Sequence, residues 1–252
     1  EVMIDGVLDG AEVQTTSGPV GIERVANGVQ VETISGQVRV SSIGGPLRVA
    51  SKSGDVDARE LGAGASAVTV GGNIRLHRVE GGPIEARAVS GEVEIEGVGR
   101  TAPIDVALET VSGIARLTDA TGTVSMKTVS GAIAGSGLTI DRLAVKTVSG
   151  DVVVGLIAPF SGPLSAETVS GSLRVEVPSS ASFRYRLVTM SGRLACEHPA
   201  ADAEETSTMM SGTVGTDGGT VNGQTLSGDI TVALVRPDRE TTGRSEDQGP
   251  AR

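Results

Sequence analysis

The sequence lacks the side chains that usually fill a thick globular core. It has two Phe, one Tyr and no Trp, so aromatic residues make up 1% of its 252 residues. Large aromatic side chains normally supply much of the buried area of such a core. The apolar residues are instead mainly Val, Ile, Leu and Ala, beside 36 Gly, which favours a thin, layered core. No stretch keeps a 3.6-residue apolar period for three turns, so we expect no substantial helix.

Further shortages exclude several classes of protein. Cys196 is the only cysteine, which rules out a disulfide within the chain. No run of eighteen apolar residues occurs, so we predict no direct membrane insertion. The net charge of −10 opposes a phosphate-binding surface, and nucleic acid is therefore not an expected partner. The chain begins at Glu1 rather than Met, which leaves open whether residues precede it and where it resides.

What the sequence does contain is a repeat, marked by one Ser-Gly or Gly-Gly step every 16 to 22 residues. A nearly constant period with small insertions is typical of stacked coils whose extra residues bulge at turns. The first residues of the steps are Ser17, Ser35, Ser53, Gly71, Ser90, Ser112, Ser130, Ser149, Ser170, Ser191, Ser211 and Ser227.

Apolar residues recur at fixed positions relative to these markers. The third residue after the marker is apolar in every repeat, as in Val20 and Val38, and the residue before it is apolar in most, as in Ile34. These positions and the marker Gly share one parity of an extended strand, so we predict that all of them face inward. The sequence thus predicts an all-β fold, a single-stranded parallel β-solenoid (β-helix) of about twelve rungs of 16–22 residues, stacked in register and right-handed.

An outward column supports the same register. The fourth residue after the marker alternates in charge over five successive rungs, so neighbouring rungs about 4.8 Å apart would pair opposite charges. Chance alternation on a solvated face is the alternative. The column consists of Arg39, Asp57, Arg75, Glu94 and Arg116.

The repeat continues without a linker, which predicts one solenoid domain over residues 1–236. Residues 1–10 are expected to form a partial capping coil, because an open solenoid end would template further pairing. Residues 237–252 are polar and contain Gly and Pro, and we predict a disordered tail.

Residues for chemistry are scarce. His77 and His198 are far apart and have no Cys or His at metal-ligand spacing, so we interpret both as surface histidines. Cys196 falls at an apolar column position and is expected to be a buried structural thiol. We therefore predict no catalytic residue, no metal site and no cofactor.

The candidate binding face is a row of hydroxyl side chains. Thr stands two residues before the marker in nine rungs, and with the marker Ser it would form an outward, stacked Thr-x-Ser array. Such an array either hydrogen-bonds between coils as a structural ladder or binds a repetitive ligand. The candidate residues are Thr110, Ser112, Thr128, Ser130, Thr147, Ser149, Thr168 and Ser170.

The block Thr-Val-Ser-Gly-Asp/Ser-Val/Leu-x-Val, at Thr147–Val154 and Thr168–Val175, resembles the bacterial adhesin family of β-strand repeats, also called toastrack domains. The resemblance covers nearly the whole chain. It implies a non-catalytic β-solenoid, often linked to envelope-stress sensing and sometimes displayed on the cell surface. Localisation at the cell envelope or surface, or at the cytoplasmic face of the membrane, agrees with it.

Three functions follow as hypotheses. The first is a non-enzymatic adhesin-like or scaffold domain that presents its repetitive Thr/Ser face to a protein or a cell-surface glycan. The second is a self-assembling filament protein, similar to bactofilins, that associates end to end or laterally. The third is a carbohydrate-active enzyme on a β-helix, for which the sequence offers neither groove aromatics nor a clustered set of charged residues.

Overall fold

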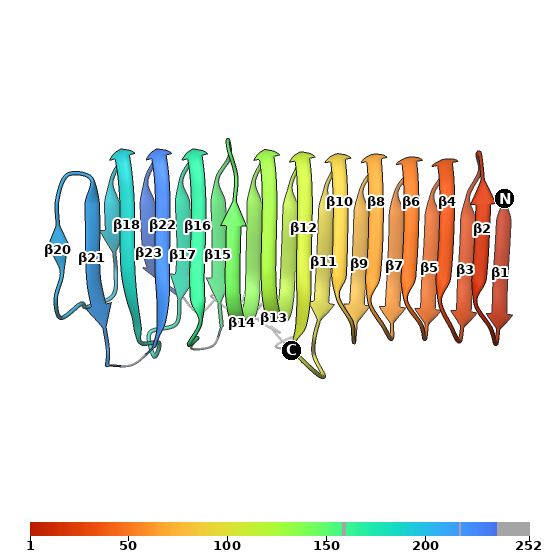
Figure 1. Cartoon of the computed structure of the whole chain (residues 1–252), viewed down its shortest axis with the longest axis horizontal. Helices are drawn as coiled ribbons and strands as arrows, with labels where there is room; N and C mark the ends of the chain where they lie inside the picture. Colours follow the sequence, from red (N-terminus) through yellow and green to blue (C-terminus); the bar gives the residue numbers. More distant parts are fainter. Residues whose placement is uncertain (158–159, 217, 236–252) are drawn as a thin grey trace, which may run out of the picture.

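The computed structural model describes residues 1–157, 160–216 and 218–235, and that part of the chain contains strands and no helix. Each regular coil contributes one strand to sheet A and one to sheet B, and the coils lie side by side along one long axis (Figure 1). The core lies between the inner faces of the two sheets. The predicted all-β parallel solenoid is confirmed, whereas its right-handed sense stays a prediction. The predicted tail, 237–252, lies outside the described residues.

The order of strands along the axis follows from their pairing. In sheet A it is β1 (Val2–Val7), β3 (Val20–Val25), β5 (Val38–Ile43), β7 (Val56–Leu61), β9 (Ile74–Val79), β11 (Val93–Val98), the first parts of β13 (Ala115–Ser130) and β14 (Ile133–Lys146), β15 (Val152–Leu156), β17 (Leu173–Val177), β23 (Ile230–Leu234) and β19 (Leu194–Cys196). In sheet B it is β2 (Ala11–Thr15), β4 (Val29–Ser35), β6 (Leu47–Ser53), β8 (Ala65–Gly71), β10 (Ile84–Ser90), β12 (Ile104–Ser112), the second parts of β13 and β14, β16 (Pro163–Ser170), β22 (Gly219–Ser227), β18 (Phe183–Ser191), β21 (Met209–Val214) and β20 (Glu204–Glu205).

The apolar columns fill the core as their spacing predicts. In the coil that follows Ser17, Val20, Ile22 and Val25 are all buried. Ile22 and Val25 both face inward although they are three residues apart, because a residue between them, within the strand, adopts a left-handed conformation. That residue is the seventh after the marker, and such a conformation shifts the strand alternation by one residue. It recurs at Arg24, Ser42, Glu60, Arg78, Gly97, Asp119 and Gly137.

The Ser-Gly step forms a corner rather than the interior of a strand. Gly36, Gly113 and Gly131 have φ values of 128°, 149° and 153°, in the region open mainly to glycine. A Cβ on Gly131 would overlap the carbonyl oxygen of Gly113 in the neighbouring coil, so the missing side chain would point along the axis and not into the core. The alternation of sheet B therefore stops at the corner, and the parity predicted across the step is wrong.

The last coils are not stacked in sequence order. Strands β22 and β23 lie between β16–β17 on one side and β18–β19 on the other. The coil that is last in the sequence therefore lies inserted between the two coils that precede it in the sequence. In this arrangement Ser227 pairs with both Ser170 and Ser191. The coils therefore stack in sequence order as far as β17 and depart from that order beyond it.

The marker at Ser211 does not begin a parallel rung. Strand β21, which contains it, runs antiparallel to β18, and the short β20 runs antiparallel to β21. This hairpin closes the C-terminal edge of sheet B, at one end of the stack (Figure 1). The aromatic residues pack beneath it: the ring centroids of Phe183 lie 6.0 Å from Phe160 and 6.3 Å from Tyr185.

Candidate functional site

The structure separates the predicted Thr/Ser array into two halves. Thr110, Thr128, Thr147 and Thr168 point inward and are at most 7% exposed. The prediction that they face solvent is wrong, because strand alternation reverses at the glycine corner and places them with the core residues. Their hydroxyl oxygens have no hydrogen-bond partner among the described residues. The exposed half of the array is Ser112, Ser130, Ser149 and Ser170.

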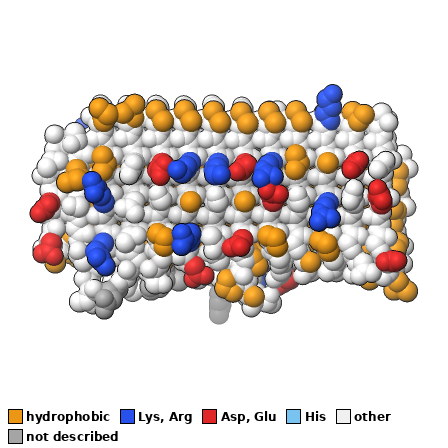
Figure 2. Space-filling model, viewed as in Figure 1, with side chains coloured by type: hydrophobic (Ala, Val, Ile, Leu, Met, Phe, Trp, Pro, Cys, Tyr) orange, Lys and Arg blue, Asp and Glu red, His pale blue; other side chains and the backbone are white. Residues whose placement is uncertain are grey.

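The side chain that faces outward next to each of these Thr residues is apolar. The side chain directly before each marker, predicted to be buried, is 46–73% exposed in nine coils. Figure 2 shows these side chains as a straight row along one edge of the molecule, interrupted once by a basic residue. We call this row the ridge: in axial order it consists of Ile34, Val70, Val89, Val111, Val129, Val148, Val169, Leu226 and Met190, with Lys52 between the first two.

Two further rows run parallel to the ridge on the outer face of sheet B. Two residues before each ridge residue stands a row of mostly charged side chains, and two residues before that row stands a row with small side chains in its middle coils and Arg48, Glu85 and Arg186 elsewhere (Figure 2). The charged row is Glu32, Ala50, Val68, Arg87, Glu109, Lys127, Lys146, Glu167, Gln224 and Val188. The small row includes Ser66, Ala107, Ser125, Ala144 and Ser165. The ridge and these two rows together are called the B face.

Ion pairs order the middle of the charged row. Glu109 accepts hydrogen bonds from Arg87 Nε at 2.9 Å and from Lys127 Nζ at 3.2 Å, and Lys146 lies 2.9 Å from Glu167. The hydrogen bond from Arg87, followed by that from Lys127, holds the pKa of Glu109 below its usual value. The carboxylate therefore keeps its charge at neutral pH, and the row carries fixed charges of both signs.

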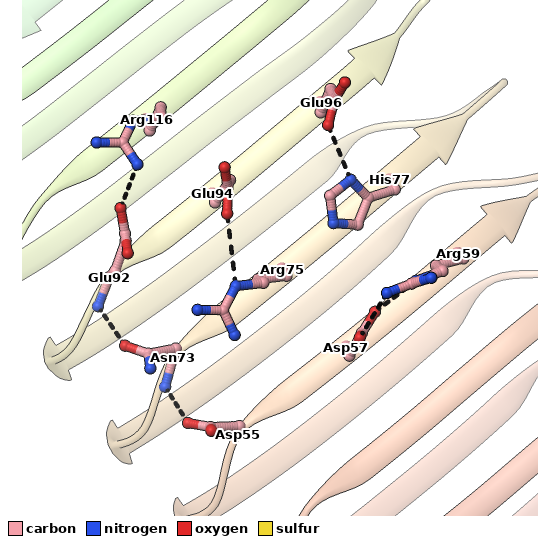
Figure 3. A network of polar contacts seen from close by, with 10 residues as sticks. All are labelled: Asp55, Asp57, Arg59, Asn73, Arg75, His77, Glu92, Glu94, Glu96 and Arg116. Atoms are coloured by element: carbon pink, nitrogen blue, oxygen red, sulfur yellow. Dashed lines mark hydrogen bonds and ion pairs between the residues drawn. The ribbon is translucent and has the colours of Figure 1, made fainter.

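The outer face of sheet A has a different chemistry, with charged and polar side chains linked across coils (Figure 3). The predicted charge column is in register, since Arg75 is paired with Asp57 on one side and with Glu94 on the other. Among the described residues of that column, Arg75 and Glu94 alone form a cross-coil ion pair, at 3.4 Å. Asp57 bonds Arg59 of its own strand instead, at 3.0 Å. The alternation thus predicts the register correctly and the ion pairs only in part.

Side-chain amide and carboxylate groups cap the same corners on the sheet A side. Asp55 Oδ1 accepts a hydrogen bond from the Asn73 backbone N–H at 2.8 Å, and Asn73 Oδ1 accepts one from Glu92 N–H at 2.8 Å (Figure 3). Asp151 and Asp229 make equivalent bonds to the adjacent coil. The second residue after the marker is therefore a structural position, which the sequence columns did not reveal because it is polar and unevenly occupied.

The residues considered for chemistry do not form a reactive group. His198 is 4% exposed and stands edge-on to Phe183, with ring centroids 5.1 Å apart, so the interpretation as a surface histidine is wrong. His77 is partly exposed, with Nδ1 3.1 Å from Glu96. Burial raises the pKa of the half-buried Cys196 thiol, which opposes a role as a thiolate nucleophile.

A shallow groove lies at the start of the sheet B strands. It is bordered by Pro46 and Pro83, and the carboxylates of Glu85 and Asp105 contribute to its lining, but no aromatic side chain does. Glu85 is already paired with Arg87. Within residues 1–157, 160–216 and 218–235, no three His, Cys, Asp or Glu side chains are grouped to hold a metal ion, and no helix is long and apolar enough to cross a membrane.

Comparison with known proteins gives one match. A family model described as Toastrack DUF4097 matches residues 47–233, well over half of the chain. Neither the curated proteins nor the solved structures contain a match. The coils before residue 47 pair in the same register as those inside the matched range, so the structural repeat extends beyond it.

Proposed function

Since the chain belongs to the Toastrack DUF4097 family, we propose that it is a non-enzymatic scaffold domain that presents its B face to a protein partner. The observation that carries this proposal is the ridge, whose apolar side chains are about half exposed in an unbroken line from Val70 to Met190. Contiguous apolar surface of this kind marks interaction sites in soluble proteins. A place at the bacterial cell envelope, in adhesion or in envelope-stress sensing, belongs to the proposal through the family resemblance alone.

A protein partner fits this face better than a glycan does. Glycan recognition by the predicted hydroxyl array required outward Thr side chains, and these are buried. Aromatic rings, which stack on sugars, are buried as well: Phe160, Phe183 and Tyr185 are all at most 7% exposed. What remains on the B face is a line of aliphatic side chains beside charges of both signs, which resembles the apolar centre and polar rim of a protein interface.

The filament hypothesis receives less support at the ends of the stack. Continued parallel stacking requires a free parallel edge in both sheets, and the antiparallel β20–β21 hairpin occupies that place at the C-terminal edge of sheet B. End-to-end assembly would have to displace this hairpin. The enzyme hypothesis gains nothing from the groove that contains Glu85 and Asp105, because one of its two carboxylates already forms an ion pair.

Photo-crosslinking in living cells tests the proposal. A photoreactive amino acid replaces Val111 on the ridge, or in the matched control Val153, which is 41% exposed on sheet A. We expect a discrete protein adduct for the ridge position and little for the control, identified by mass spectrometry. Equal adduct yields at the two positions, or none at the ridge, would contradict a binding role for the B face.

A further inference from the structure

The B face is regular in a way that limits what can cover it. Its apolar side chains repeat at the spacing of parallel strands, about 4.8 Å, over the whole distance from Val70 to Met190. An ordinary globular surface does not present apolar groups at this interval over such a distance, whereas another β-solenoid does. The best match in spacing is therefore a second molecule built on the same period.

The geometry points to a second copy of this chain as the occupant of the B face. The two copies pack B face to B face, with their long axes antiparallel and a two-fold axis that passes beside Val129, parallel to the strands. This inference rests on the proposed function, since it takes the B face to be a protein-binding surface. A two-fold axis in this direction sets each row against the same row of the other copy.

The charged row selects this position of the axis. With Val129 at the centre, Glu109 faces Lys146 of the second copy and Arg87 faces its Glu167, and symmetry makes each pair occur twice. Lys127, beside the axis, meets the Lys127 of the second copy, and near the two ends of the overlap Arg48 meets Arg186. Opposite charges thus meet at four places across the interface, which gives the dimer a preferred register.

Neighbouring positions of the axis are worse. Moving it one coil toward Val111 sets Glu109 against itself and Arg87 against Lys127. Moving it half a coil toward Val148 sets Glu109 against Glu167, which also places two carboxylates together. Like charges brought together at an interface weaken it and exclude the wrong register.

The other two rows agree with the same axis. On the ridge, Val111 meets Val148, Val89 meets Val169 and Val70 meets Leu226 of the second copy, while Lys52 meets Met190 near the end. In the small row, Ser125 lies at the axis and Ala107 faces Ala144, so this row leaves room beside the long side chains of the charged row.

The face is also large enough. Its overlap spans roughly 40 Å along the axis and about 17 Å across the strands, or roughly 700 Å² per copy. Specific interfaces bury about 800 Å² per partner. The B face therefore offers an area close to that of an ordinary dimer without any change in the fold.

Sedimentation equilibrium of the purified chain tests the association. The wild-type protein is expected to form a concentration-dependent dimer, and Val129→Lys to weaken it about a hundredfold, since two buried lysines would join Lys127 at the axis. Val153→Lys, which adds the same charge to sheet A, is the matched control and should dimerise like the wild type. Circular dichroism and thermal melts confirm that both variants are folded.

Spin-label distances test the register. In a Cys196→Ser background, single Ser→Cys changes at Ser90, Ser130 and Ser170 each receive a nitroxide, and pulsed electron paramagnetic resonance measures the distance between the two copies. Ser130 should give the shortest distance. Ser90 and Ser170 should give equal, longer distances, because each pair is separated axially by about four coil spacings, roughly 19 Å.

Each failure has its own meaning. A strict monomer at hundreds of micromolar overturns the dimer, but leaves the proposed function standing if Val111 still crosslinks to a different protein in cells. If Val153→Lys weakens the dimer as much as Val129→Lys does, the B-face arrangement is overturned. Unequal spin-label distances at Ser90 and Ser170 overturn it as well. Absence of ridge adducts in cells together with a strict monomer overturns both.

Discussion

At the scale of single residues, the marker glycine meets two separate demands. Its backbone has a positive φ at most steps, and its missing Cβ leaves room for a carbonyl oxygen of the adjacent coil. The marker serine meets neither demand, and Gly71 replaces it without disturbing the pairing of β8 with β10. The glycine therefore carries the main structural requirement of the step, whereas the serine adds, in some coils, a hydrogen bond to a carbonyl oxygen of the adjacent coil, as from Ser90 Oγ to Val70 at 3.3 Å.

Gly131→Ala is expected to destabilise the protein by about 2–4 kcal/mol, because the added methyl group strains a left-handed backbone and overlaps Gly113. Urea unfolding measures the change. Gly71→Ser is the matched control, since a Cβ at that position meets nothing closer than 3.9 Å. A loss of stability in the control equal to that of Gly131→Ala would contradict this account of the step.

The inward Thr side chains differ in whether their hydroxyl is bonded. Thr128 has no hydrogen-bond partner among the described residues, whereas Thr189 donates to the carbonyl oxygen of Gly228 at 3.2 Å. Replacing the unbonded hydroxyl removes a buried polar group that gains nothing in the folded state.

Thr128→Val is therefore expected to leave stability unchanged or to raise it by about 1 kcal/mol, and Thr189→Val to lower it by about the same amount. Chemical denaturation of both variants checks the pair. If Thr128→Val is instead as destabilising as Thr189→Val, then the Thr128 hydroxyl has a stabilising role that its surroundings do not explain.

At the scale of secondary structure, the sequence predicts the strands well and their connections less well. The columns three and five residues after the marker, such as Val20 and Ile22, are buried as expected because period-2 alternation holds within a strand. The alternation fails at the corner, where a left-handed glycine reverses it and exchanges the places of Thr128 and Val129. Composition alone gives no sign of that reversal, since Thr and Val both suit strands.

The order of the last coils could not be predicted from the sequence either. All coils carry the same apolar columns, so β22 fits against β16 as well as β18 would. The pattern therefore predicts that each strand pairs with an equivalent strand of another coil, but it does not identify that coil. His198 lies between β19 and β20, outside the regular coils, so the sequence columns do not predict its burial against Phe183. The B face depends on the corner geometry, which the sequence columns do not reveal.

The hairpin protects an edge that would otherwise pair with other chains. Gly212 in β21 lies against Tyr185 of β18, and a Cβ there would come within 2.6–3.0 Å of the phenol ring and its oxygen. Gly212→Ala is expected to loosen the hairpin, speed hydrogen exchange in β18 and increase aggregation on mild heating. Gly155→Ala, where a Cβ has 3.7 Å of room, is the control. Unchanged exchange in β18 would mean that the hairpin does not guard this edge.

At the scale of the whole molecule, each coil touches only its neighbours, so stability should be local along the axis. Ile230 is buried in the inserted coil, in register with Leu173 on one side and Leu194 on the other. Its loss should be felt by both flanking coils, whereas the coils near the N-terminus have no contact with it.

Ile230→Ala is therefore expected to destabilise the C-terminal coils by about 2–5 kcal/mol. Hydrogen exchange followed by mass spectrometry should show faster exchange in β17, β18 and β19 and no change in β3 to β7. Val38→Ala, in the N-terminal part of the array, should give the reverse pattern. Uniform acceleration along the whole chain would show that the solenoid unfolds as a single cooperative unit instead.

The inserted coil also determines how the molecule resists a pulling force. Strand β1 is bonded along one side only, to β3, so tension applied at the N-terminal end can peel it away one hydrogen bond after another. Strand β23 is bonded on both sides, to β17 and β19, and tension applied beyond it must shear two ladders at once. The domain is therefore a mechanically asymmetric link, weak to tension at its first strand and strong at its last.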